Sequence, residues 1–66
     1  MSAKALSYMN CVILDLMKYY SLSEEAATNA VKRSYLYESL RQNPTETMHD
    51  SVSSSAADVY AEIYAD

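Results

Sequence analysis

Apolar side chains recur every three or four positions along most of the chain, a spacing that places them on one face of an α-helix. Over residues 2–20 this spacing predicts a first helix whose core-facing stripe is Leu6, Met9, Ile13, Leu16, Met17 and Tyr20. The stripe is widened to about half of the helix surface by Tyr8, Val12 and Tyr19. Such a broad apolar arc indicates a helix that is central to the fold or that also packs against a second chain.

The rest of this first helix is polar. Ser2 is placed to cap its N-terminus, and the solvent side is marked by Lys4, Ser7, Asp15 and Lys18. Cys11 falls on the polar arc, where we expect a partly covered small residue at the edge of the core.

A second helix is predicted over residues 23–33. Ser23 supplies an N-cap hydroxyl, and the two glutamates that follow it suit the positive end of the helix dipole. One face of this helix is formed by Ala26, Ala27, Ala30 and Val31. A capping box between Ser21 and Glu24 is the alternative start, and it would draw Leu22 into the helix.

The apolar pattern changes phase after this segment. Carried on as one straight helix, Leu36 and Leu40 would lie away from the alanine face, whereas they form an i, i+4 pair in a separate short helix. We therefore predict a third helix over residues 35–42, capped by Ser34 after a bend near Arg33. A single bent helix is the alternative.

The third helix should end before the only proline. Asn43 precedes Pro44, and the residue before a proline is disfavoured in the α region. Residues 45–55 are polar apart from Met48 and Val52, so we expect them to form the longest loop and the most mobile segment.

A last helix is predicted from within residues 53–55 to about residue 64, with Ser55 and Asp58 as a capping box. Its apolar face would consist of Ala56, Val59, Tyr60 and Ile63. Glu62 and Asp66 lie near the negative end of this helix dipole, so we expect that end to be frayed or covered by a cationic partner.

Composition favours an all-α fold. The 66-residue chain has no glycine and one proline, which leaves little of the turn chemistry that β-hairpins need. We expect a single helical domain over residues 1–66, a small bundle of three to four short helices with the first helix central. One hydrophobic core is only marginally stabilising at this size, and association with a copy or with another protein commonly adds stability.

The charge balance argues against polyanionic partners. Nine acidic and five basic side chains give a net charge of −4, and Lys32–Arg33 is the only adjacent basic pair. This balance disfavours binding to nucleic acid or to an anionic membrane surface, because both depend on clustered Lys and Arg, unless a partner in a complex supplies that charge. The single cysteine forms no internal disulfide, and the apolar run of residues 11–17 is too short to span a membrane. With no secretory leader expected either, we predict a cytoplasmic protein.

Residues that carry chemistry are few. The chain has one histidine and one cysteine, and His49, Asp50 and Ser51 are direct neighbours, whose side chains rarely point at one another. A metal needs three or four converging ligands, and the common phosphate-binding loops need glycine. We therefore expect no enzyme activity, no metal, no cofactor and no small-molecule substrate.

All seven aromatic residues are tyrosines. A buried tyrosine must keep its hydroxyl bonded or wet, so we expect these rings at core edges and in contact with a protein partner. The residues predicted to bind that partner are Tyr8, Val12, Tyr19, Tyr35, Tyr37, Glu38, Tyr60 and Tyr64.

The order of segments, from LSEEAATNAVKRS through LRQNP to VYAEIY, resembles small all-helical bacterial proteins of uncharacterised role, some of them encoded beside toxin genes. This resemblance implies a partner-binding protein. Residues 34–39, SYLYES, are similar to the inhibitory helix of the antitoxins of Fic-domain toxins, which has Ser or Thr, three residues, Glu, then Gly or Asn.

Ser34 and Glu38 match that helix, and Ser39 departs from it. The similarity implies that Glu38 would pair with an arginine in the nucleotide site of the partner. The alternative is that Ser34 caps a helix and Glu38 is solvated.

These observations predict a non-enzymatic interaction or regulatory protein, antitoxin-like, that acts as a homodimer or in a hetero-complex. The alternative is a small nucleic-acid-binding regulator with a helix-turn-helix around Lys32 and Arg33. An accessory subunit of an enzyme is a third interpretation, which differs from the first only in the partner.

Overall fold

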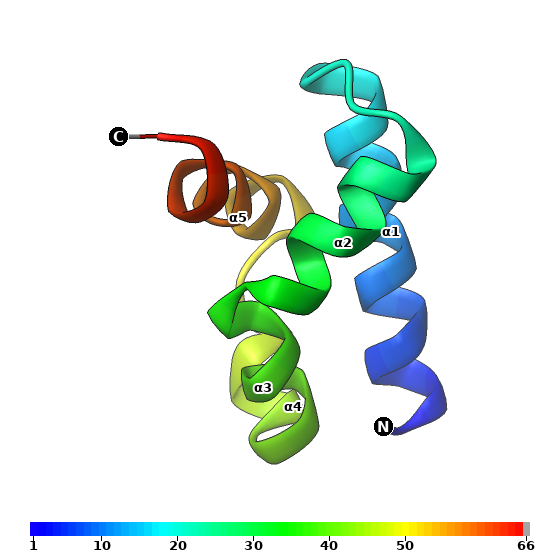
Figure 1. The fold of residues 1–66 in the computed structure, drawn as a ribbon. Helices are drawn as coiled ribbons and strands as arrows, with labels where there is room; N and C mark the ends of the chain where they lie inside the picture. The colour runs from blue at the N-terminus through cyan, green and yellow to red at the C-terminus, as the bar shows by residue number, and fades with distance from the viewer. Residues whose placement is uncertain (66) are drawn as a thin grey trace.

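The computed structural model describes residues 1–65, which form five α-helices and contain no strand. Their bounds are α1 Ala3–Tyr19, α2 Glu24–Arg33, α3 Tyr35–Gln42, α4 Pro44–Thr47 and α5 Val52–Tyr64. α1 runs along the molecule and packs against α2 and α5, while α3 and α4 lie together below α5 in the view of Figure 1. The all-α class is confirmed. The predicted number of three to four helices is wrong, because the short helix α4 forms within the expected loop.

Three serines begin three of the helices in the same way. The hydroxyl oxygens of Ser2, Ser23 and Ser51 each accept the backbone N–H three residues later, at 3.1 Å. Each cap occupies an amide that has no partner within its helix, which stabilises the fold by about 1 kcal/mol. The predicted caps at Ser2 and Ser23 are confirmed, and Leu22 lies before α2.

The predicted polar loop over residues 45–55 is wrong. Pro44 lies in the first turn of α4, where the missing N–H of proline removes no helical hydrogen bond, and α5 begins at Val52. Ser55 therefore lies inside α5 and does not cap it; the cap is Ser51. A sequence signal for this earlier start exists, because Val52 is four residues before Ala56 and continues the apolar face.

The core lies between one face of α1 and the inner faces of α2, α3 and α5. Its buried apolar residues are Ala5, Met9, Val12, Ile13, Leu16, Ala27, Ala30, Val31, Leu40, Ala56 and Val59. Relative to the predicted stripe, the buried face of α1 is rotated by roughly 45° toward Ala5 and Val12.

This rotation overturns the prediction that Leu6 faces the core. Leu6 is 47% exposed, whereas its neighbour Ala5 is completely buried. The packing of α5 on α1 explains the difference: Ala5 and Ala56 are both fully buried, and such small side chains let two helices approach closely.

The turn between α1 and α2 uses a serine where glycine is common. Ser21 has a φ of 57°, in the left-handed region, and follows the α1 C-cap Tyr20. The chain reverses there, and the Leu22 N–H donates to the Leu16 carbonyl at 3.4 Å. A non-glycine residue in this conformation costs about 1 kcal/mol.

Ser34 is the single residue between α2 and α3. Its backbone is extended, with φ −88° and ψ 163°, so two separate helices are confirmed and the single bent helix is wrong. The prediction that its side chain caps α3 is also wrong. Ser34 is buried, and its hydroxyl donates back to the Val31 carbonyl at 2.7 Å.

Candidate functional site

An uncharged, largely apolar strip runs along the outside of α1. We call Leu6, Asn10, Leu14 and Met17 the outer α1 surface. Leu14 is 61% exposed and Leu6 is 47% exposed, and the sequence reasoning missed both as surface residues. The strip borders a shallow groove of about 400 Å³ between α1 and α2, whose α2 side is formed by Glu24, Thr28 and Lys32.

Two apolar seams follow α1 at heptad-like spacing. Ala5, Met9, Val12 and Leu16 form the inner seam and are buried in the core. One residue further along the chain, Leu6, Asn10, Ile13 and Met17 repeat the same 4, 3, 4 spacing and form an outer seam. Leu6 and Asn10 are exposed and Met17 is half-buried, whereas Ile13 belongs to the core. The sequence signal for the second seam is therefore this repeat, shifted by one position.

Asn10 is the only polar member of the outer seam, and it is exposed. A carboxamide both donates and accepts hydrogen bonds, so it can be paired within an apolar contact. Glu24 and Lys32, which carry opposite charges, line the neighbouring groove from α2. The strip itself carries no charge.

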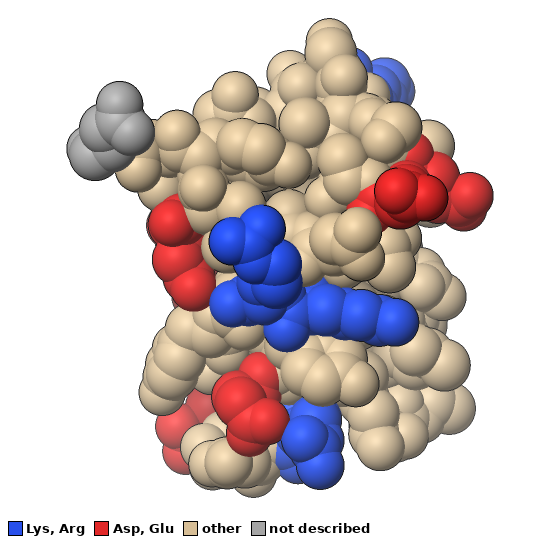
Figure 2. Space-filling model, in the orientation of Figure 1, with Lys and Arg blue, Asp and Glu red and all other residues tan. Residues whose placement is uncertain are grey.

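Basic side chains gather elsewhere. Figure 2 shows Lys and Arg in the middle of one face, over α2 and α3, with acidic groups on either side and below. The last turn of α2 contributes Lys32 and Arg33, and that of α3 contributes Arg41.

The predicted partner-binding residues do not form one surface. Val12 is completely buried in the core and offers nothing to a partner, so its place in that set is wrong. Tyr37 is half-buried and packs against the core. Tyr19 and Tyr35 are the most exposed rings, at 64% and 70%, and the Lys18 amine lies 5.2 Å from the centre of the Tyr19 ring.

Tyr8 uses its hydroxyl inside the chain. This oxygen lies 2.7 Å from Ser55 Oγ and 2.7 Å from the Asp50 carbonyl, to which it donates. Ser55 is buried, so the hydroxyl of Tyr8 gives that side chain its partner. Tyr8 thus joins α1 to the first turn of α5.

Three tyrosines stack at the other end of α1. The ring centres of Tyr20 and Tyr60 are 4.6 Å apart, and those of Tyr60 and Tyr64 are 5.0 Å apart. The ring planes in the two pairs are tilted by 24° and 28°, so both pairs are stacked. Tyr64, at 43% exposure, leaves the outer end of this stack open.

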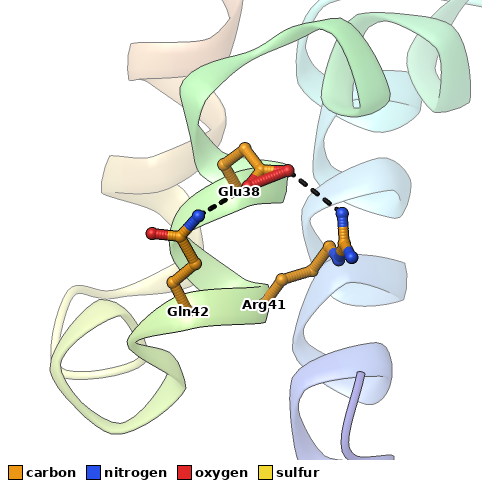
Figure 3. A network of polar contacts seen from close by, with 3 residues as sticks. All are labelled: Glu38, Arg41 and Gln42. Atoms are coloured by element: carbon orange, nitrogen blue, oxygen red, sulfur yellow. Dashed lines mark hydrogen bonds and ion pairs between the residues drawn. The ribbon is translucent and has the colours of Figure 1, made fainter.

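Glu38 is held by its own helix. One of its oxygens accepts from Arg41 at 3.1 Å and the other accepts from Gln42 at 2.9 Å (Figure 3). Both ionic partners are about half exposed, so the pair adds at most a few tenths of a kcal/mol. Ser34, the other residue of the antitoxin-like pattern, is buried.

Cys11 lies on α1, whereas His49, Asp50 and Ser51 lie between α4 and α5. Cys11 is exposed on α1, which overturns its expected place at the edge of the core. The Ser51 hydroxyl accepts from the Ser54 amide as the α5 cap. Among residues 1–65 no three His, Cys, Asp or Glu side chains come close enough to hold a metal ion. None of the helices in this range combines the length and apolarity needed to cross a bilayer.

Comparison with protein-family models, with curated proteins and with solved structures finds no match for this chain.

Proposed function

We propose that this chain is a non-enzymatic interaction protein that pairs with a second copy of itself through the outer α1 surface. The observation that carries the proposal is the pair of exposed leucines, Leu6 and Leu14, on either side of Asn10. A surface helix of a monomer normally presents charged or polar residues at such positions.

A second copy fits this strip because a two-fold interface must be complementary to itself. Uncharged apolar side chains meet that condition, and so does the carboxamide of Asn10, which can donate to and accept from its own counterpart. A polar asparagine in an otherwise apolar helical seam is also a known means of fixing register between two helices. Because the chain carries a net charge of −4, an uncharged contact keeps the acidic groups of two copies apart.

Chain size supports the same proposal. A domain of 66 residues buries a small core, and dimer formation would add apolar burial at Leu6, Leu14 and Met17. The stability of the fold would then depend on protein concentration.

The test is the mass in solution by light scattering over a concentration series. We expect a dimer for the natural sequence and a monomer for Leu14→Glu, since a buried unpaired carboxylate opposes association. Ala57→Glu is the matched control, because it places the same charge on an exposed position of α5 and should stay dimeric. The proposal would be overturned if the natural sequence and both variants were all monomeric at the highest concentration.

The other interpretations receive less support. The antitoxin-like role needs Glu38 to pair with an arginine of a partner, yet both of its oxygens already accept from Arg41 and Gln42. A helix-turn-helix joins its two helices by a turn of about three to four residues, whereas Ser34 alone joins α2 and α3. The antitoxin-like role and the nucleic-acid-binding role stay predictions, and each requires a partner other than a second copy of this chain.

A further inference from the structure

A second groove lies where α3, α4 and α5 meet. Its volume is about 320 Å³, near the lower end of the range for small-molecule sites. In Figure 1, α5 lies at the left and α3 and α4 lie below it. Leu36 of α3 and Val59 of α5 are its apolar lining residues, and Val59 is 1% exposed. Tyr35 also lines the groove and is 70% exposed.

The charge in this groove has one sign. Asp50, Asp58 and Glu62 line it, and the described lining residues include no Lys or Arg. Glu62 is already engaged, since both of its oxygens accept the Tyr35 backbone amide at 3.1 Å. Asp50 and Asp58 are exposed, and their carboxylates are the ones open to a ligand.

We propose that this groove binds an arginine side chain presented by a different protein. The apolar lining matches the aliphatic stem of arginine, and the carboxylates of Asp50 and Asp58 match its planar, charged end. Arginine fits better than lysine because its planar guanidinium bonds a carboxylate through two N–H groups and also stacks on aromatic rings, and Tyr35 is an exposed lining residue of the groove. The surplus of negative charge on the chain favours the approach of such a basic partner.

This inference goes beyond the proposed homodimer and does not depend on it. The groove is formed by residues of α3, α5 and the segment between them, and none of the outer α1 surface lines it. A single molecule of this protein could bind its copy and the basic partner at the same time.

The test uses the full chain and a blocked Ala-Arg-Ala tripeptide, followed by NMR of the backbone amides. We expect saturable shifts at Leu36, Asp58 and Val59, and no such shifts with the peptide that has citrulline in place of arginine. Citrulline has nearly the same shape without the charge. Asp58→Asn should weaken binding by about threefold to fivefold, the usual effect of one exposed ion pair.

Asp15→Asn is the matched control, since it removes the same charge from α1 outside the groove and should leave the affinity unchanged. Equal shifts with the arginine and citrulline peptides, or no saturable shift at all, would overturn the proposal. Repeating the titration with Leu14→Glu distinguishes the arginine-binding groove from the proposed homodimer. If this variant no longer self-associates but still binds the peptide, the groove is supported independently of the dimer.

Discussion

The carboxylate of Glu62 on α5 accepts the backbone N–H of Tyr35, the first residue of α3, with 3.1 Å to each of its oxygens. A side chain 27 residues away thus supplies the cap that Ser34 does not provide. The prediction of an unfavourable carboxylate near the end of α5 misses this contact, because Glu62 also faces the positive N-terminus of α3.

Replacing Glu62 should therefore destabilise the fold. We expect Glu62→Ala to lower the free energy of unfolding by about 1 kcal/mol, the usual value of a helix cap, and Glu62→Gln to lower it less because the amide oxygen can still accept. Urea denaturation measures both. Asp58→Ala, which removes an exposed carboxylate one turn earlier in α5, should change stability much less; equal effects would mean that general charge, and not the cap, is responsible.

Removing the Tyr8 hydroxyl should leave buried polar groups without a partner. We expect Tyr8→Phe to cost about 1–2 kcal/mol, since Ser55 is buried and its hydroxyl would lose its contact with the Tyr8 oxygen. A double-mutant cycle with Ser55→Ala should show that the two losses are coupled. Tyr19→Phe is the control, because Tyr19 is 64% exposed and should lose little stability. Additive losses of unfolding free energy for the Tyr8 and Ser55 variants would contradict a direct hydrogen bond between them.

Glycine at position 21 should stabilise the chain. Ser21 has a left-handed backbone, and glycine adopts that conformation without the clash of a Cβ atom, so Ser21→Gly should raise the free energy of unfolding by up to about 1 kcal/mol. The same replacement at Ser7, an exposed position inside α1, should lower it by about half a kcal/mol. We expect the two variants to shift the midpoint of thermal unfolding in opposite directions. A lower midpoint for both would rule out a strained turn at position 21.

The Cys11 thiol should react in the folded state. Because Cys11 is exposed on α1, we expect a disulfide reagent such as Ellman's reagent to modify one thiol per chain without denaturant. Comparing the rate in buffer and in urea checks this. A thiol that reacts only after unfolding would mean that this side of α1 is covered in solution.

The sequence predicts the features that depend on neighbouring residues. Serine caps at positions 2 and 23 and the joint at Ser34 follow from local capping and from the phase of the apolar residues. The predicted start of α5 is wrong because Val52 lies in a polar stretch of sequence, although it continues the face of Ala56 and Val59. This signal lies in neighbouring residues, so the sequence alone is sufficient to place the start of the helix.

The remaining errors arise from contacts between distant segments. Which of Ala5 and Leu6 faces the core depends on how closely α5 packs against α1, and no spacing within α1 specifies that. The bond from Tyr35 to Glu62 and that from Tyr8 to Ser55 join residues 27 and 47 positions apart. The groove between α3, α4 and α5 also depends on such contacts, whereas the outer α1 surface has a local signal in the shifted 4, 3, 4 repeat.

The packing of α5 on α1 also bears on how the chain folds. The contacts among α2, α3 and α4 join segments that are close in sequence, and such local structure forms within microseconds. Joining Tyr8 to Ser55 instead requires the closure of a loop across 47 positions, whose entropic cost must be met before the contacts between α1 and α5 can form. We infer that the meeting of the two end helices is the late, rate-limiting event. Substitutions at Ala5 or Ala56 should then speed unfolding, whereas substitutions between α2 and α3 should slow folding.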